Sequence, residues 1–129
     1  MRLLDDVELA DAADKMPSEI SGGMKKRVAI ARAMALDPEV VFLDEPSAGL
    51  DPITSSSLDD LILKLKREKG MTFVVVTHEL PSIFKIADRC AMFDKARRGM
   101  IALGTPGGLR DGSVDPFVKK FFTRGECHV

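Results

Sequence analysis

The stretch Val-Val-Phe-Leu-Asp-Glu-Pro at positions 40–46 decides the fold class of this chain. Its first four residues form a continuous apolar run rich in β-branched side chains, which is typical of a strand buried on both faces of a parallel sheet. A similar run, Thr-Phe-Val-Val-Val, occupies positions 72–76, and residues 54–69 between the two runs carry apolar side chains at helical spacing. The order strand, helix, strand predicts an α/β fold with a mostly parallel sheet and flanking helices.

The rest of the chain divides into shorter predicted elements. Apolar spacing, prolines and glycines predict helices over residues 1–14, 22–36 and 81–87 and after Pro116, and strands over residues 90–93 and 100–103. The Gly-Thr-Pro-Gly-Gly run at 104–108 predicts a break in regular structure.

Composition limits the classes of function. The 129 residues are 45% hydrophobic and 30% charged, as in a soluble globular domain, and the net charge of −1 gives no general attraction for nucleic acid. The longest apolar run, Phe73–Val76, is too short to cross a bilayer, and the start of the chain is unlike a secretory signal. These features predict a cytoplasmic protein that reaches a membrane only through a partner.

The first candidate site is Ile-Ser-Gly-Gly-Met at positions 20–24, at the start of a predicted helix. Two glycines let a ligand approach the backbone, and the exposed amides of a first helical turn attract phosphate oxygens. A serine-capped helix start with a flexible turn explains the same residues without a ligand.

The second candidate site is the pair Asp44 and Glu45, which follows the first predicted strand. Ligands bind at the carboxyl ends of strands in open parallel sheets, so Asp44 is placed to hold Mg²⁺ and Glu45 to polarise an attacking water. The alternative is a solvated strand end. His78 follows the second predicted strand at the same edge, where it could sense a γ-phosphate or serve as a structural hydrogen-bonding group.

Taken together, these residues closely resemble the ATP-binding subunits of ABC transporters over nearly the whole chain. Residues 20–24 match the family signature, with Met24 where Gln is commonest, and residues 40–45 match the Walker B strand and its catalytic Glu. Residues 47–51 match the D-loop, and His78 matches the switch histidine. Four motifs in the family's order make a chance match very improbable.

The resemblance implies ATP and Mg²⁺ as cofactors and gives each residue a role. Glu45 and His78 would be catalytic, and Asp44 would hold the metal. Ser21, Gly22 and Gly23 would clamp ATP held by the opposite subunit of a dimer, and Asp51 would couple the two sites. The family also implies transmembrane permease subunits as partners and a position on the inner face of the cytoplasmic membrane.

No Gly-x-x-x-x-Gly-Lys-Ser/Thr motif occurs in the sequence, so the expected fold is a partial P-loop NTPase fold that lacks the Walker A strand and loop. Three segments are expected: the end of a helical subdomain with the signature (1–37), a catalytic sheet (38–104) and a C-terminal helical tail (105–129). Without a phosphate-binding loop the isolated chain is expected to be inactive. A non-catalytic module that lends its signature to a partner's ATP site is the alternative.

Within the family the chain looks most like the ATPases of the Mla and Mce-associated lipid-transport systems. The likeness rests on residues 16–19, 23–27, 51–54 and 115–117 and on the pair Phe121-Phe122. It implies lipid as the transported substrate and a lipid-binding Mce or Mla component as a further partner. Soluble family members that act on ribosomes or chromosomes fit less well, because residues 47–51 differ from the former and no heptads indicate the coiled coils of the latter.

Overall fold

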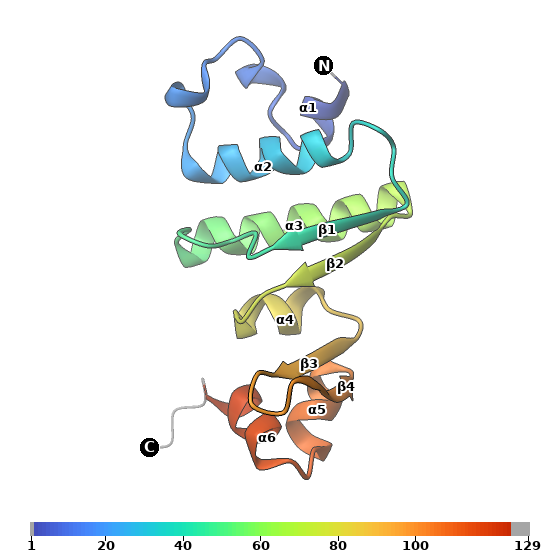
Figure 1. The fold of residues 1–129 in the computed structure, drawn as a ribbon. Coiled ribbons are helices and arrows are strands. Elements are labelled where there is room, and N and C mark those ends of the chain that lie inside the picture. Colours follow the sequence, from blue (N-terminus) through green and yellow to red (C-terminus); the bar gives the residue numbers. More distant parts are fainter. Residues whose placement is uncertain (1, 125–129) are drawn as a thin grey trace. The chain divides into compact units, whose positions relative to one another are not determined.

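The computed structural model describes residues 2–124, and their helices and strands follow one another from blue to red in Figure 1. The chain forms two compact units, Met1–Thr77 and His78–Val129. The three functional segments predicted above are defined by motifs and stay a prediction; residues 125–129 of the last segment lie outside the described residues.

The first unit contains three α-helices, two short 3₁₀ turns and two strands. These are α1 (Arg2–Asp6), η1 (Ala10–Ala12), η2 (Pro17–Glu19), α2 (Gly22–Ala33), β1 (Val40–Asp44), α3 (Pro52–Lys69) and β2 (Thr72–Val76).

Helix α3 follows from local sequence signals. Asp51 caps its N-terminus, Pro52 occupies its first turn, and Gly70 ends it in the left-handed conformation with φ 65°. The predicted apolar stripe is buried as expected, and its members are Leu58, Leu61, Ile62 and Leu65. This helix therefore supplies four of the buried apolar side chains of the first unit.

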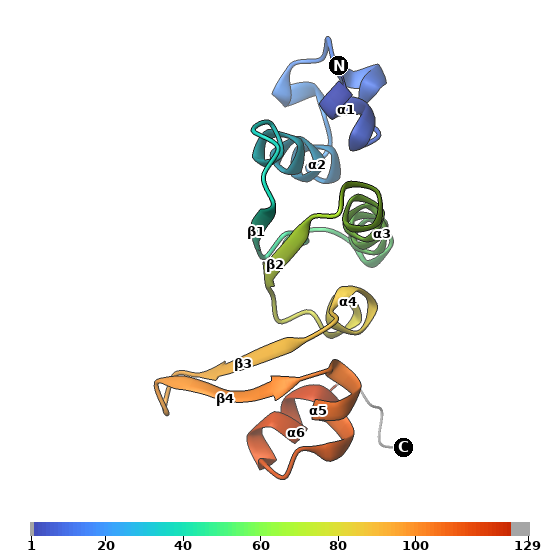
Figure 2. The ribbon, with the colours of Figure 1, turned by 90° about the vertical axis from the view of Figure 1, so that its right-hand side faces the viewer.

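Strands β1 and β2 pair in parallel, as predicted, with Val40 opposite Thr72 and Asp44 opposite Val76. The prediction that these strands are buried on both faces is wrong. Val41 is 3% exposed, but its neighbour Phe42 is 75% exposed. In Figure 2, α3 lies on one side of this strand pair, and no other described element of the first unit covers the opposite side.

The N-terminal segment is not the single helix over residues 1–14 that its apolar spacing predicted. Helix α1 ends at Asp6, and Glu8 adopts a left-handed backbone with φ 63°. Arg27 of α2 donates to the Val7 carbonyl at 3.2 Å and to the Glu8 carboxylate at 3.0 Å, and Lys64 of α3 lies 3.5 Å from the same carboxylate. These tertiary contacts, with the complete burial of Val7, outweigh the local helical preference.

Helix α2 is three residues shorter than the predicted 22–36. It ends at Ala33, and the following segment turns through Asp37, whose φ is 53°. Leu36 is 95% exposed, so continuing the helix would bury nothing at that position. The Asp37-Pro38 pair sets an outer limit to the helix, because a residue before proline avoids helical geometry. The helix stops before that limit, and the chain then turns with the Asp37 amide donating to the Met34 carbonyl at 3.0 Å.

The second unit contains α4 (Leu80–Ile86), β3 (Cys90–Asp94), β4 (Gly99–Gly104), α5 (Pro106–Gly112) and α6 (Pro116–Thr123). Strands β3 and β4 form an antiparallel hairpin, which their short connection requires. Helices α5 and α6 pack against each other, and α5 contacts β4. The unit's core consists of Leu80, Ile83, Leu109, Val118 and Phe122.

Helix α5 lies where the sequence predicted only a break. The Thr105 hydroxyl accepts a hydrogen bond from the Gly108 amide at 3.0 Å, Pro106 occupies the first turn, and Leu109 is buried. Proline in the first turn of a capped helix is favourable, and burial of Leu109 offsets the low helical preference of the glycines. No helix within residues 2–124 is both long enough and apolar enough to cross a membrane.

Candidate functional site

The turn that contains Ser21, Gly22 and Gly23 begins α2. The Ser21 hydroxyl accepts a hydrogen bond from the Met24 amide at 3.2 Å, and Ser21 keeps an extended backbone, as an N-cap residue does. Ser21 and Gly22 are exposed, and Gly23 is half-buried. The turn therefore presents its backbone at the surface, where a phosphate could approach the amides.

Asp44 and Glu45 mark the carboxyl end of β1. The Glu45 amide donates to the Val76 carbonyl at 2.7 Å, which extends the pairing of β1 with β2 by one residue. Glu45 itself has φ 46°, a left-handed conformation that is uncommon for a residue with a side chain. Its carboxylate accepts a hydrogen bond from the Thr77 hydroxyl at 3.3 Å. Asp44 is exposed beside it.

The conformation of Glu45 separates the two neighbouring carboxylates. In a continuing strand they would already alternate between faces, and the left-handed turn at Glu45 bends the chain as well. Such backbone conformations cost of order 1–3 kcal/mol and are concentrated at functional sites. We therefore treat the strand end as the centre of the candidate site.

The segment 47–51 forms a compact turn that leads into α3. Gly49 has φ 78°, and the Leu50 amide donates to the Ser47 carbonyl at 3.1 Å. Asp51 caps α3: its two carboxylate oxygens accept hydrogen bonds from the Thr54 amide at 2.9 Å and the Thr54 hydroxyl at 2.7 Å. The hydroxyl and then the amide of Thr54 lower the pKa of Asp51 below its ordinary value, so this exposed residue stays charged near neutral pH.

The structure brings two of the predicted motifs into contact. A Cβ added at Gly22 would lie 3.7 Å from Cδ2 of Leu50, and one added at Gly23 would lie 2.7 Å from Cγ2 of Thr54. The start of α2 and the start of α3 are therefore adjacent within the first unit. Thr54 had no role of its own in the sequence prediction, although it belongs to the segment 51–54. The available signal is its position three residues after Asp51, because an N-cap side chain accepts a hydrogen bond from an amide at that spacing.

His78 is the first residue of the second unit. Its Nε2 lies 3.3 Å from a carboxylate oxygen of Glu79, and its side chain is 66% exposed. Its predicted place beside a γ-phosphate stays a prediction, as do the roles of the other candidate residues.

The chemistry of the site suits a metal that arrives with a nucleotide. Within residues 2–124, no three His, Cys, Asp or Glu side chains gather to enclose a metal ion. Mg²⁺ is commonly held by one or two carboxylates together with substrate phosphates and water, and Asp44 offers one carboxylate of this kind. The site therefore suits Mg²⁺ that is bound together with a nucleotide, rather than a metal ion enclosed by protein ligands alone.

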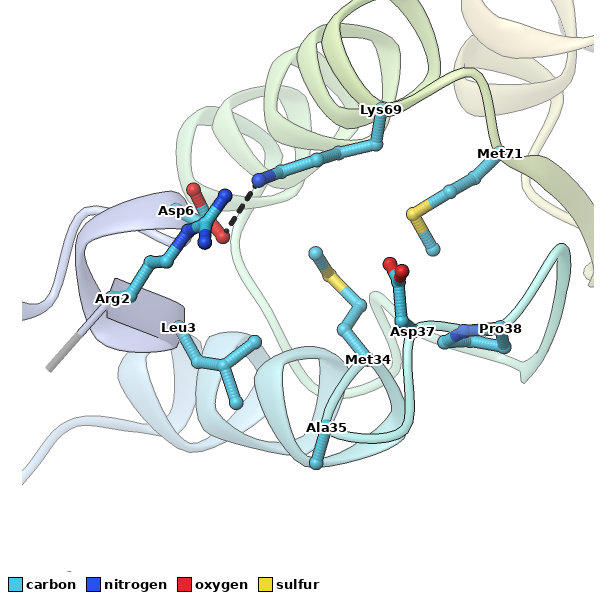
Figure 3. Close-up of a pocket in the computed structure, with 9 residues that line it drawn as sticks. All are labelled: Arg2, Leu3, Asp6, Met34, Ala35, Asp37, Pro38, Lys69 and Met71. Atoms are coloured by element: carbon cyan, nitrogen blue, oxygen red, sulfur yellow. Dashed lines mark ion pairs between the residues drawn. The ribbon is translucent and has the colours of Figure 1, made fainter.

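A cavity of about 290 Å³ lies elsewhere in the first unit, among α1, the end of α2 and the end of α3 (Figure 3). An ion pair between Lys69 and Asp6, with 3.0 Å between Nζ and Oδ2, borders it. Two methionines, Met34 and Met71, also line it. None of the candidate residues lines this cavity, and its mixture of acidic, basic and apolar side chains favours no single ligand.

Comparison with known proteins places the chain in a family. The model of the family described as "ABC transporter" matches residues 1–48. The methionine import ATP-binding protein MetN of Lactobacillus delbrueckii subsp. bulgaricus is 43% identical over 115 residues, which are 89% of this chain and 31% of that protein. The intermembrane phospholipid transport system ATP-binding protein MlaF of Escherichia coli K12 is 43% identical over 121 residues, which are 94% of this chain and 44% of that protein.

Solved structures agree with the sequence relatives. The ADP conformation of MJ1267, an ATP-binding cassette of an ABC transporter, superposes with a TM-score of 0.80 and 29% identity, over 97% of this chain and 48% of that one. The chain therefore belongs to the ABC transporter family and has the fold of part of an ATP-binding cassette. It spans less than half the length of the curated relatives described above.

Proposed function

We propose that this chain supplies the catalytic carboxylate and the signature turn of an ABC transporter's ATP-hydrolysing subunit. The observation that carries the proposal is the end of β1, where Asp44 and the left-handed Glu45 follow a parallel strand pair. In open α/β sheets this is the edge at which ligands bind. Membership of the family supplies the reaction class, and the strand end supplies residues suited to it.

The residues at the strand end have distinct roles in this proposal. Asp44 would hold Mg²⁺, which would neutralise phosphate charge when bound with ATP. The Glu45 carboxylate would accept a proton from the attacking water, and Thr77, which donates to it at 3.3 Å, would orient it. His78 would contact the γ-phosphate and respond to its release.

The residues at the two adjacent helix starts would act across a dimer of ATPase subunits. Ser21, Gly22 and Gly23 would contact the γ-phosphate of ATP bound to the opposite subunit through the exposed amides of the first α2 turn. Asp51, held in place by Thr54, would report the state of one ATP site to the other. The Ser21–Gly23 turn and Asp51 lie next to each other on the first unit, so one surface of that unit could contact the opposite subunit through both.

The transported substrate is the finer part of the proposal. The relative MlaF is a phospholipid-transport protein and favours lipid, with permease subunits and a lipid-binding Mce or Mla component as partners on the inner face of the cytoplasmic membrane. The relative MetN, a methionine import protein, is equally identical and makes methionine the competing substrate. Transport assays of the complete subunit with its permease, supplied with labelled phospholipid or methionine, discriminate the two.

The isolated chain of 129 residues is expected to bind nucleotide weakly and to hydrolyse almost none, because its sequence contains no phosphate-binding loop. Calorimetry with Mg·ATP on the purified chain measures this directly. Micromolar affinity in that titration would rule out the dependence on a separate phosphate-binding loop.

The alternative function is a non-catalytic module that lends its signature turn to a partner's ATP site. It predicts that Ser21→Ala lowers a partner's hydrolysis rate, whereas Glu45→Gln leaves the rate unchanged. The proposed function predicts losses for both substitutions once a phosphate-binding half is present.

A further inference from the structure

The first turns of α2 and α3 approach so closely that a side chain does not fit between them at Gly23. A Cβ added there would lie 2.7 Å from Cγ2 of Thr54, shorter than carbon atoms tolerate. Gly22, one residue earlier, has room for a Cβ at 3.7 Å from Leu50. The close approach is therefore specific to one glycine and one methyl group.

Thr54 has little freedom to move away from Gly23. Its hydroxyl donates to Oδ2 of Asp51 at 2.7 Å, and its amide donates to Oδ1 at 2.9 Å. Threonine carries its methyl and hydroxyl on the same Cβ, so a rotation about χ1 that moved the methyl would also withdraw the hydroxyl from Asp51. The position of the methyl group is thus fixed by the hydrogen bond on its other side.

The facing turn is fixed as well. The Ser21 hydroxyl accepts a hydrogen bond from the Met24 amide at 3.2 Å, which closes the turn that contains Gly23. At these two capped helix starts the Thr54 methyl therefore lies against the Gly23 backbone. Further along the same two helices, Nη2 of Arg27 donates to the Ser57 hydroxyl at 2.8 Å. Any approach of one turn to the other must displace Thr54.

We propose that Thr54 is a positioning residue that sets the spacing between the Ser21–Gly23 turn and Asp51 within one subunit. Its hydroxyl holds Asp51, and its methyl rests against Gly23. This inference rests on the proposed function, because the spacing acquires a role when both groups act on nucleotide in a dimer. A movement of the Ser21–Gly23 turn toward α3 would displace Thr54 and so release Asp51. Nucleotide contact at the Ser21–Gly23 turn would in this way affect Asp51.

Two substitutions at Thr54 separate its methyl from its hydroxyl. Thr54→Val keeps the shape but removes the hydroxyl, so the pKa of Asp51 should rise toward its ordinary value. Thr54→Ser keeps the hydroxyl and removes the methyl, so the Asp51 pKa should stay low. Carbon-13 NMR titration of the Asp51 carboxyl in the 129-residue chain measures both. An Asp51 titration that Thr54→Val leaves unchanged would overturn the proposal.

Size compensation tests the contact with Gly23. Gly23→Ala should displace Thr54 and raise the Asp51 pKa, and adding Thr54→Ser should restore it, because serine lacks the methyl that the new Cβ meets. Gly22→Ala is the matched control and should leave the Asp51 titration unchanged, since that position has room. If Gly23→Ala acted only through helical preference, Asp51 would titrate as in the wild type and the contact would be refuted.

Two further measurements keep the outcome decisive. If Gly23→Ala does not fold, the contact is tested from the other side by comparing the NMR amide resonances of Gly22 and Gly23 in Thr54→Val and Thr54→Ser. Different chemical shifts in the two variants support the contact with the Thr54 methyl, and identical shifts overturn it. In the subunit completed by a phosphate-binding half, Gly23→Ala should lose hydrolysis and the double variant should regain it. If the wild-type subunit itself shows no hydrolysis, the proposed function fails, while the nucleotide-free titration still decides the role of Thr54.

Discussion

The two units of this chain use their carboxylates differently. In the first unit, Asp44 and Asp51 are exposed at the end of a strand and the start of a helix. In the second unit, Asp94 and Asp115 converge on one guanidinium, that of Arg97. The comparison indicates that the exposed Asp44 carboxylate at the end of β1 is placed for a ligand, whereas Asp94 and Asp115 hold parts of the second unit together through Arg97.

Arg97 illustrates the structural use of charge. Its Nε donates to Asp94 at 2.8 Å, and its Nη2 donates to Asp115 at 3.3 Å. Asp115 also caps α6 by accepting a hydrogen bond from the Phe117 amide at 2.9 Å. One side chain thus joins the β3–β4 hairpin to the first turn of α6. Changes at Asp44 and Glu45 should alter chemistry with little effect on stability, and changes around Arg97 should do the reverse.

The largest expected effect is that of Glu45→Gln in a subunit completed by a phosphate-binding half. Glutamine keeps the size and can still accept from Thr77, but it cannot take a proton from water. Hydrolysis should fall by roughly 10²-fold or more, the scale of a positioned acid–base group. ATP should still bind and hold a dimer together. Steady-state hydrolysis and thermal unfolding measured on the same samples test the separation of chemistry from stability.

Glu39→Gln is the matched control. It removes the same charge from the residue that precedes β1, at the end of the strand opposite to Glu45. It should leave both hydrolysis and the unfolding temperature unchanged. A Glu45→Gln subunit that hydrolyses ATP at the wild-type rate would exclude the general-base role. A large fall in its unfolding temperature would instead show that the first unit uses this carboxylate structurally.

The second expected effect concerns Gly22→Asp. A Cβ fits at this position, 3.7 Å from Leu50, so the substitution tests charge rather than packing. A carboxylate facing a γ-phosphate across a closed dimer interface repels it by several kcal/mol, which should block hydrolysis. Acidic residues are favourable in the first turn of a helix, so stability should change little. Gly107→Asp, in the first turn of α5, is the control and should retain activity.

A mixed dimer shows whether Gly22 acts across the interface. One subunit carries Gly22→Asp and the other carries a disabled phosphate-binding loop, so one composite site has both defects and the other has neither. About half of the wild-type activity should remain if the sites fire independently. Mixed dimers no more active than either mutant homodimer would favour obligate coupling or a role within one subunit, and a fully active Gly22→Asp homodimer would remove the signature turn from the mechanism.

The elements predicted best from the sequence are those that local signals define. Helix α3 has a capping Asp51, a terminal Gly70 and an apolar stripe, and all of these act within one segment. The parallel pairing of β1 with β2 followed from two apolar runs around that helix. The motifs were equally visible in the sequence, because their residues are close together along the chain.

The predictions that were wrong concern contacts between distant segments. Glu8 breaks the expected N-terminal helix because Arg27 and Lys64 reach it from two other helices. Phe42 is exposed because only one face of its strand is covered by described residues of the first unit. The approach of Thr54 to Gly23 depends on how two helix starts meet, which apolar periodicity does not encode.

The smallest expected effect is on stability in the second unit. Arg97 lowers the pKa of both Asp94 and Asp115, chiefly through its hydrogen bonds to them. A carboxylate whose pKa is lower in the folded state stabilises the fold above its ordinary pKa of about 3.9 and ceases to do so as the pH falls through the folded value. Arg97→Met should therefore lower the melting temperature at pH 7. The change should be modest, because the Arg97 side chain is 48% exposed and solvent screens it.

The pH dependence identifies the cause of that change. The difference in melting temperature between wild type and Arg97→Met should shrink as the pH falls below about 4, because both carboxylates are then protonated in the unfolded chain and progressively in the folded one. Lys95→Met removes the same charge from the same turn and should show no such pH-dependent difference. Calorimetric melting curves from pH 2.5 to pH 7 would measure all three proteins. A difference in melting temperature that stays constant over this pH range would mean that Arg97 stabilises the hairpin by packing rather than by charge. One such packing interaction places Cζ of Arg97 6.0 Å from the centroid of the Phe117 ring.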